Sequence, residues 1–312
     1  MQSNINICTL SIFIIESMTT RIGRHINISK GFVSAPEYAK NIGCSVFQIF
    51  LGAPQQILSK ARQKDELIEF GKQLIKHDLI MVVHGSYTIN LCHPPGSKKF
   101  ETSIKSLVKD LNATNLIGDR CLGVIIHMGK NISENKLTVD QAIDNYVTGI
   151  KTALSQTPDN TTIVLETGAS QGSEVASHID GLAQIYWCLN DAERERVYFC
   201  IDTCHIWATG YDISSPTGVK KFFKEFDKKI GVEKISCIHF NDSKTGLESK
   251  VDRHADLCYG EIGSNGLKAI AKFAKEYKIH LIMETPLDAI NPETNQEISY
   301  NEEYNKVKSW LK

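Results

Sequence analysis

Short apolar runs of strand-forming residues alternate with helical patterns along the chain after residue 20. Apolar runs of this length are typical of strands covered on both faces. They predict strands over Ile22–Ile28, Ser45–Leu51, Ile80–Gly85, Cys121–Met128, Thr161–Thr167, Val197–Thr203, Ile235–Asp242 and His280–Pro286. The segments between and after them predict helices over Pro36–Ile42, Lys64–His77, Lys98–Leu116, Val139–Leu154, Val175–Leu189, Val219–Ile230, Leu267–Tyr277 and Glu302–Leu311.

Eight alternating strand–helix units favour parallel strands joined by right-handed crossovers. Because eight such units close naturally into a ring, we predict a single α/β domain, a (β/α)₈ TIM barrel over residues 21–312. An open doubly wound sheet is the alternative. It more often carries a Gly-rich phosphate turn after its first strand, and Arg24–Gly31 lacks that pattern. Residues 1–20 are expected to form a poorly ordered N-terminal extension.

Composition narrows the class of protein. Of 312 residues, 42% are hydrophobic and 23% charged, as in ordinary globular domains, which excludes a disordered or collagen-like chain. The net charge is −1, so any nucleic acid must meet a local basic face. The nine cysteines form no repeated C-x-x-C pair, which indicates reduced thiols inside a cell. No apolar run reaches the roughly 20 residues of a membrane span, and residues 5–15 lack the basic flank of a secretion signal.

Side chains that can bind metal follow six consecutive predicted strands, at the end where active sites of (β/α)₈ barrels lie. They are His84, His127, Glu166, Asp202, His205, His239, Asp252, His254 and Glu284. A lone histidine or aspartate at such a place is more often a hydrogen-bonded structural residue or a helix cap. Nine together would each cost several kcal/mol to bury without a compensating cation. The set therefore predicts a multinuclear metal site.

Imidazole and carboxylate ligands suit zinc, and also manganese or iron. Nine ligands fit three cations if one carboxylate bridges. Divalent cations roughly 3.5–4 Å apart stabilise the attacking and leaving oxygens of phosphoryl displacement, and metal-bound water supplies hydroxide near neutral pH. The cluster thus predicts hydrolysis of a phosphate ester. His25 could only support other ligands, and Cys200 and Cys204 are expected to be packing residues.

Several stretches resemble the endonuclease IV family of apurinic/apyrimidinic endonucleases, from about Arg21 to the C-terminus. The resemblance is carried by His84–Leu91, Phe199–His205, His239–Lys244 and Asp252–His254, with Gly52–Gln56 and Glu284–Pro286 also fitting. It implies a TIM barrel with three Zn²⁺ per chain. Within it His84, His127 and Glu166 would hold one ion. Glu166 would bridge to a second held by Asp202, His239 and Glu284, and His205, Asp252 and His254 would hold the third.

The resemblance also implies the reaction, that of a zinc-dependent phosphoric diester hydrolase of the deoxyribonuclease IV type. The family cleaves the phosphodiester 5′ to an abasic site in base excision repair, leaving a 3′-hydroxyl and a 5′-deoxyribose phosphate, and trims blocked 3′ ends. Glu166 and Glu284 would be the catalytic carboxylates beside a metal-activated hydroxide. The expected partner is double-stranded DNA carrying abasic sites or blocked 3′ ends.

DNA contacts are expected in the loops at the same rim. Tyr87 would help to wedge the helix open, with Gln55 and Gln56 in the minor groove, while Arg253 and Lys244 would meet phosphates. Two positions depart from the family pattern: Thr88 replaces a large apolar residue, and Glu248 replaces glycine.

We expect a monomer without membrane attachment, located in the cytoplasm or nucleoid, or in a nucleus or virion for a viral source.

Two other functions fit parts of the pattern. A metal-dependent sugar isomerase or epimerase shares the barrel and uses one or two metals, but it has no need of Asp252 and His254. Metal content per chain would separate it from a nuclease. A non-catalytic module that binds damaged DNA would be expected to lack at least one ligand, and none is missing.

Overall fold

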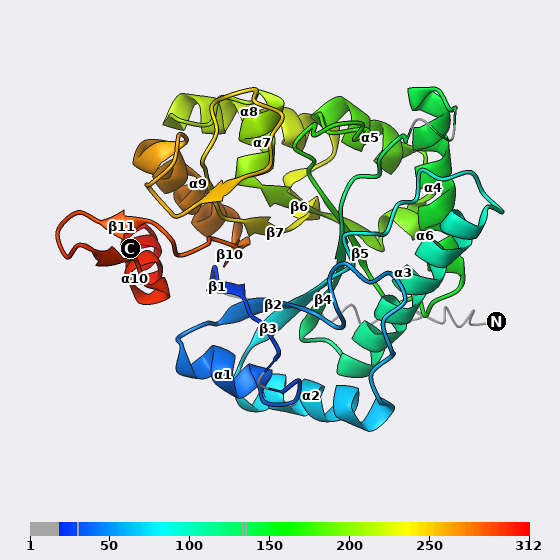
Figure 1. Ribbon diagram of the computed structural model, residues 1–312, viewed down its shortest axis with the longest axis horizontal. Helices are drawn as coiled ribbons and strands as arrows, with labels where there is room; N and C mark the ends of the chain where they lie inside the picture. The colour runs from blue at the N-terminus through cyan, green and yellow to red at the C-terminus, as the bar shows by residue number, and fades with distance from the viewer. Residues whose placement is uncertain (1–18, 30, 133, 135) are drawn as a thin grey trace, which may run out of the picture.

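The computed structural model describes residues 19–29, 31–132, 134 and 136–312. Its centre is a closed barrel of parallel strands, with helices on the outside (Figure 1). The barrel strands are β1 (Ile22–His25), β2 (Val46–Phe50), β3 (Ile80–His84), β4 (Cys121–Ile126), β5 (Ile163–Glu166), β6 (Val197–Asp202), β7 (Ile235–His239) and β10 (His280–Met283). Since β1 pairs with both β10 and β2, the ring is complete. The predicted (β/α)₈ barrel is confirmed.

Helices follow the barrel strands in sequence and cover the outer face of the ring. They are α1 (Ala35–Asn41), α2 (Lys64–Lys76), α3 (Lys98–Ile117), α4 (Val139–Ser155), α5 (Ile179–Trp187), α6 (Asp191–Arg194), α7 (Thr203–Thr209), α8 (Pro216–Lys229), α9 (Gly263–Tyr277) and α10 (Tyr300–Trp310), with a 3₁₀ turn at Val232–Lys234. Hydroxyl side chains begin several of them: Ser97 accepts the Phe100 N–H and Thr138 accepts the Gln141 N–H.

Local interactions explain where the structure differs from the predicted boundaries. A short helix, α7, starts directly after β6 because the Asp202 carboxylate caps it, accepting the His205 N–H at 2.9 Å. Helix α5 begins at Ile179, four residues later than predicted, after Ala176 adopts a left-handed φ of 56°. Two small hairpins were not predicted: β8 (Asp242–Ser243) with β9 (His254–Ala255), and β11 (Ile290–Asn291) with β12 (Gln296–Glu297).

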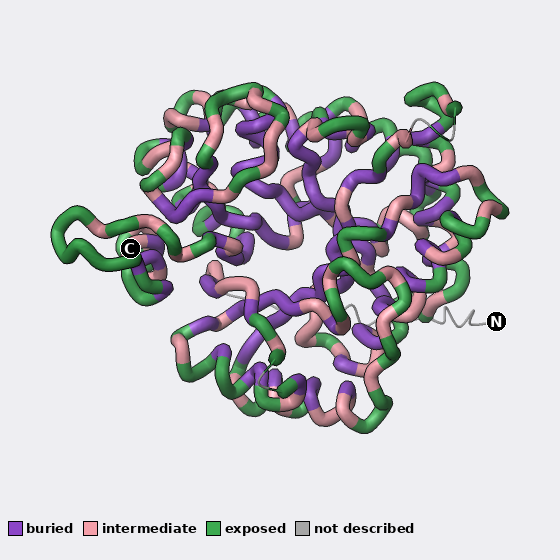
Figure 2. The backbone as a smooth tube through the Cα atoms, in the orientation of Figure 1, coloured by how far each residue is buried: buried purple, intermediate pink, exposed green. Residues whose placement is uncertain are grey.

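Two apolar layers stabilise the barrel. The larger lies between the strands and the helices, and the barrel strands are the most continuously buried part of the chain (Figure 2). The smaller cluster consists of alternate strand residues: Val46, Ile80, Val82, Ile125, Val164, Cys200, Cys237 and Ile282. Because successive strand residues point to opposite faces, this second set marks the barrel interior. Cys200 is therefore a packing residue, as expected.

The structure describes only the end of the predicted N-terminal extension, and it tests the membrane prediction for the described helices alone. Residues 1–18 lie outside the described part of the chain, and the boundary at residue 21 stays a prediction. Within the described part, the Thr20 hydroxyl already donates to the Ala274 carbonyl of α9 at 2.8 Å. No described helix is long and apolar enough to cross a membrane.

His280, at the start of β10, predicts an acid-sensitive contribution to folding. Burial, aided by the Arg21 charge, lowers the pKa of its imidazole from 6.5 to about 4, and its Nδ1 accepts the Arg21 N–H. The unfolded chain therefore binds a proton at higher pH than the folded chain. Stability is complete above pH 6.5 and falls as the pH drops towards 4, by roughly 3 kcal/mol at most from this residue.

We expect His280→Asn to flatten that part of the stability profile, because asparagine Oδ1 can accept the same N–H and does not titrate. Urea unfolding of both proteins at pH 7 and pH 4.5 measures the difference. Equal pH slopes for the two proteins would contradict the assignment.

Candidate metal centre

A ring of polar side chains lies one layer above the apolar interior of the barrel. Each member follows an interior apolar residue by two positions, so the strand period of two points it into the same interior. The members are Gln48, His84, His127, Glu166, Asp202, His239 and Glu284. This periodicity explains why strands far apart in sequence place side chains that can bind metal in the same layer of the barrel interior.

The first group consists of His84, His127 and Glu166. The Nε2 atoms of the two histidines each lie 3.4 Å from Glu166 Oε2 and 3.3 Å from each other. His84 donates its Nδ1 proton to the Gly85 carbonyl at 2.7 Å. Its Nε2 lone pair is therefore free and faces the centre of the group.

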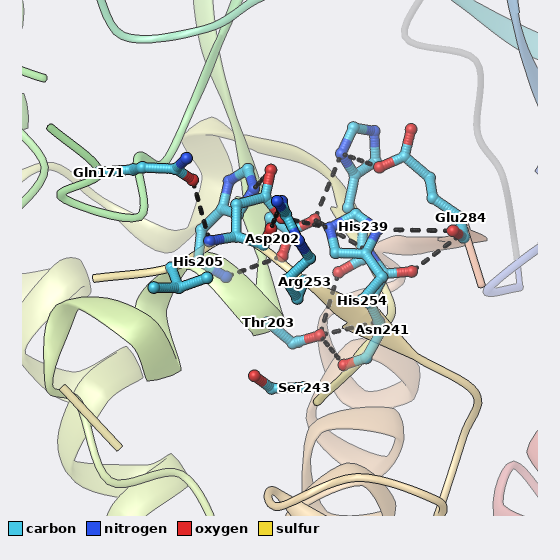
Figure 3. A network of polar contacts seen from close by, with 12 residues as sticks. Gln171, Asp202, Thr203, His205, His239, Asn241, Ser243, Arg253, His254 and Glu284 are labelled. Carbon is cyan, nitrogen blue, oxygen red and sulfur yellow. Dashed lines mark hydrogen bonds and ion pairs between the residues drawn. The ribbon is translucent and has the colours of Figure 1, made fainter. Parts of the chain in front are cut away.

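The second group shares Glu166 with the first and adds Asp202, His239 and Glu284. His239 Nδ1 lies 2.8 Å from Glu166 Oε1, 3.2 Å from Glu284 Oε2 and 3.8 Å from Asp202 Oδ2. Asn241 contacts two members of this group: its amide N–H donates to the Asp202 carboxylate at Oδ2, and its side-chain carbonyl accepts the Glu284 backbone N–H, both at 2.8 Å. Figure 3 shows Asp202, His239 and Glu284 in one cluster.

The third group consists of His205, Asp252 and His254. Asp252 Oδ2 lies 3.2 Å from His205 Nε2, and Asp252 Oδ1 lies 3.2 Å from His254 Nε2. The β8–β9 hairpin brings His254 beside Asp202 Oδ2, at 3.5 Å, and Gln171 holds the Asp252 backbone N–H at 3.0 Å (Figure 3). His205 donates Nδ1–H to the Thr167 carbonyl at 2.7 Å, which leaves Nε2 for the group.

Opposite charges control protonation across the cluster. Burial disfavours the charged form of His239, but the Glu284 and Glu166 carboxylates outweigh it and raise the pKa to about 10. Burial is likewise outweighed at His254, where mainly Asp202 and Asp252 raise the pKa to about 9. Burial dominates at His127 and lowers its pKa to about 4. Protons thus balance the buried carboxylates in the metal-free protein, and a cation could replace them.

Orphaned buried atoms test whether a cation fits these residues. Glu166 Oε2, His205 Nε2 and His254 Nε2 are inaccessible and make no hydrogen bond within the described chain. Each atom points into one of the three groups, and the two imidazole nitrogens would offer a lone pair there once their protons leave; such buried atoms are costly unless a ligand satisfies them. The donor set therefore fits divalent cations. Cys204 also lies beside Asp202 and His254, but burial raises its pKa to about 12, which disfavours the ligating thiolate.

The predicted DNA-contact residues on the β2 and β3 loops lie together at the rim. Tyr87 is 51% exposed, and its ring packs edge-on against His84 and His127 at 5.3 and 5.4 Å. The Pro54 carbonyl accepts the Tyr87 N–H at 2.9 Å, which ties this loop to the neighbouring exposed Gln55 and Gln56.

The other residues singled out from the sequence are also exposed. Lys244 pairs with Asp288 at 2.7 Å, and Arg253 donates to the Asp252 carbonyl at 2.7 Å, beside the third group. Thr88 shares a hydrogen bond with Ser86 at 2.8 Å. Glu248 has a left-handed φ of 61° and faces solvent, so the conformation is one that favours the glycine of the family pattern.

Two hollows open from the cluster. One, of about 870 Å³, contains parts of all three groups and extends past Lys98, Lys99 and Lys130. The other, of about 730 Å³, lies towards Arg24. Tyr87, His254 and Glu284 line both, so Tyr87 stands where the hollows meet.

Sequence reasoning missed Gln48 and gave His25 only a supporting role. Gln48 is fully buried and contacts His239, Glu284 and His25. Burial lowers the pKa of His25 to about 4, which keeps it neutral. The signal for Gln48 was available, because it lies two positions after Val46 within an apolar strand.

Comparison with known proteins identifies the family. A family model describing a xylose isomerase-like TIM barrel matches residues 36–308. A protein of Cenarchaeum symbiosum (strain A), named as a probable endonuclease 4, is 34% identical over 271 residues, which cover 86% of this chain and 94% of that protein. The range matched by the family model includes all nine predicted ligands.

Solved structures agree. Endonuclease IV from Thermus thermophilus has a TM-score of 0.76 and 28% identity, covering 93% of this chain and 98% of the other. A D-tagatose 3-epimerase-like protein has a TM-score of 0.65 at 13% identity, covering 94% and 97%, which shows the shared fold alone. The chain therefore belongs to the xylose isomerase-like TIM-barrel family and, within it, to the endonuclease IV family.

Proposed function

We propose that this protein is a metal-dependent DNA-repair nuclease that hydrolyses the phosphodiester 5′ to an abasic site. The products would be a 3′-hydroxyl and a 5′-deoxyribose phosphate, and blocked 3′ ends would be trimmed at the same site. The observation that carries the proposal is the sharing of Glu166 between two groups of ligand atoms, with a third group alongside. The similarity to probable endonuclease 4 proteins supports the choice of substrate.

Three cations, zinc or alternatively manganese or iron, would occupy the three groups. His84 and His127 would hold the first with Glu166, and His205, Asp252 and His254 the third. Glu166 would also hold the second, together with Asp202, His239 and Glu284. Divalent ions so placed would lower the pKa of water and stabilise the oxygens of phosphoryl displacement.

The protein's own residues would orient that chemistry. Asn241 and the His205 backbone N–H fix the Asp202 carboxylate, and Asn241 also holds the Glu284 backbone, so these groups are oriented before DNA binds. Glu166 and His239 are buried, so their charged or polar atoms face the cluster and not bulk solvent. Arg253 and Lys98 line the approach, where they would meet neighbouring phosphates.

A duplex with one synthetic abasic site tests the proposal directly. We expect a single cut on the 5′ side, with a 3′-hydroxyl identified by sequencing-gel mobility and by extension with a DNA polymerase. A cut on the 3′ side, or no cut by metal-loaded protein, would contradict it. Ketose sugars supplied to the same preparation test the isomerase alternative, and turnover of sugar without DNA cleavage would favour that alternative.

Tyr87→Ala should weaken DNA binding without removing metal. Tyr87 makes ring contacts with His84 and His127 and is half exposed between the two hollows. Stacking and wedge contacts are worth roughly 1–3 kcal/mol per base, so we expect binding to an internal abasic site to fall about 10- to 100-fold. Fluorescence anisotropy with labelled duplex, alongside elemental analysis, measures both properties.

A 3′-blocked end provides the matched substrate, because a helix end needs less distortion than an internal site. Equal losses on the two substrates would show that Tyr87 acts through the fold of its loop. Thr88→Leu should tighten binding to the internal site if a larger apolar side chain helps to open the helix. An unchanged affinity would indicate that other residues open the helix, and Gln55 and Gln56 would be substituted next.

The proposal includes a monomer with its catalytic domain over residues 21–312 and damaged double-stranded DNA as its partner inside the cell. All nine proposed ligands come from one chain, so a second copy is not needed to complete the site. Sedimentation of the protein with and without an abasic duplex tests the monomer.

A further inference from the structure

Gln48 on β2 is a buried amide that makes three hydrogen bonds inside the barrel. Its side chain has no exposed surface. Oε1 lies 2.8 Å from His239 Nε2 on β7, and Nε2 lies 2.6 Å from Glu284 Oε1 after β10. The same Nε2 lies 3.0 Å from His25 Nδ1 on β1. One side chain thus links groups from three other strands.

The chemistry of its partners determines which way the amide faces. The Glu284 carboxylate can only accept, so it must face the amide NH₂. Neutral His25 accepts the second N–H through Nδ1. The amide oxygen is then left for His239, whose Nε2 must carry the proton that it donates. Both amide protons and the oxygen are used, and reversing the amide would break all three contacts.

This arrangement decides which atom of His239 can bind a cation. A neutral imidazole with its proton on Nε2 has its lone pair on Nδ1. That Nδ1 is the atom that lies 2.8 Å from Glu166 Oε1 and 3.2 Å from Glu284 Oε2. Gln48 also donates a hydrogen bond to Glu284 Oε1, which leaves Oε2 of Glu284 to face the second ligand group.

We propose that Gln48 is the positioning residue of the second ligand group: it fixes the His239 tautomer with Nδ1 as the ligating atom and selects Oε2 of Glu284. This inference rests on the proposed cation site and adds a residue that contacts neither cation nor DNA. Hydrogen-bond partners of this kind orient ligands, and their loss typically lowers metal affinity about 10- to 100-fold.

Two substitutions separate the two parts of this role. Gln48→Met keeps the approximate volume and removes every hydrogen bond. Gln48→Glu can still accept the His239 Nε2 proton, but its carboxylate repels Glu284 and donates nothing. Ile49→Ala is the matched control, because Ile49 is buried on the opposite face of β2 and packs in the outer layer, so it loosens the same strand without contacting the network.

The experiment measures zinc binding by competition with a chromophoric chelator, and the His239 tautomer by nitrogen–proton correlation spectra of the zinc-loaded protein. Circular dichroism confirms that each variant is folded. We expect one zinc equivalent to bind about 10- to 100-fold more weakly in both Gln48 variants, and unchanged affinity in Ile49→Ala. The parent tautomer, protonated on Nε2, should persist in Gln48→Glu and be lost in Gln48→Met.

Full zinc affinity in folded Gln48→Met, or weakening by Ile49→Ala equal to that of the Gln48 variants, would overturn the positioning role while leaving the proposed nuclease intact. Absence of zinc binding by the unsubstituted protein would instead overturn the proposed cation site, and this inference with it. A His239 that ligates through Nε2 in the unsubstituted protein would overturn the inference alone.

Discussion

Glu166→Ala should lower the cleavage rate more than the loss of any ligand that serves only one group. Glu166 Oε2 faces His84 and His127, while Oε1 faces His239, so its removal opens two of the three groups. Each cation supplies several kcal/mol of transition-state stabilisation, and about 1.4 kcal/mol is tenfold in rate. We therefore expect a loss of about 10⁴-fold for Glu166→Ala and about 10²-fold for His84→Ala.

Cleavage rates on the abasic duplex and metal content per chain are the measurements. Glu166→Gln is the matched control for volume, since it fills the same buried space without the charge. We expect it to fold normally and to lose metal as Glu166→Ala does. Retention of metal and activity by Glu166→Ala, with only a lower melting temperature, would assign Glu166 a structural role.

Removal of metal by a strong chelator should reduce cleavage to background. The ligand atoms lie in three groups, so the active protein is expected to contain close to three cations per chain. Each group combines carboxylates with imidazoles that must be neutral to ligate, so metal loading should release protons and weaken as the pH falls. Elemental analysis and restoration of cleavage by added Zn²⁺, Mn²⁺ or Fe²⁺ measure this dependence.

Full activity with one cation or none would contradict the trinuclear site. Tyr87→Ala is the internal control, because its metal content should match that of the unsubstituted protein. A chelator effect on DNA binding alone, with cleavage by the bound fraction unchanged, would also contradict the proposed role of the cations.

Much of this protein can be predicted from local sequence. The apolar strand runs and amphipathic helices predict the order of elements, because a strand covered on both faces must be apolar and a helix packed on one side must be amphipathic. His84, Glu166 and Asp202 were identified because they end such strands. Asp252 and His254 were identified because they lie in the loop after the seventh predicted strand, and the family motifs then assigned them with His205 to a third cation.

Other features depended on neighbours in space. The β8–β9 hairpin is what brings His254 to Asp202, a pairing that the residues next to either of them in sequence do not predict. The cap of α7 by Asp202 is local, three residues apart, but the pattern of apolar positions did not predict that helix. The start of α5 likewise depends on the left-handed conformation of Ala176, which strand and helix patterns do not predict.

The sequence by itself determined eight strands and the types of side chain at their ends, since side-chain chemistry and a period of two are local properties. The tertiary structure decided how those side chains meet. Barrel closure and register place Asp202 beside His239 and bring Gln48 from β2 to His239 on β7. The atom of His239 that can ligate is thereby chosen by a residue 191 positions away, because only closing the ring brings that amide within hydrogen-bonding distance.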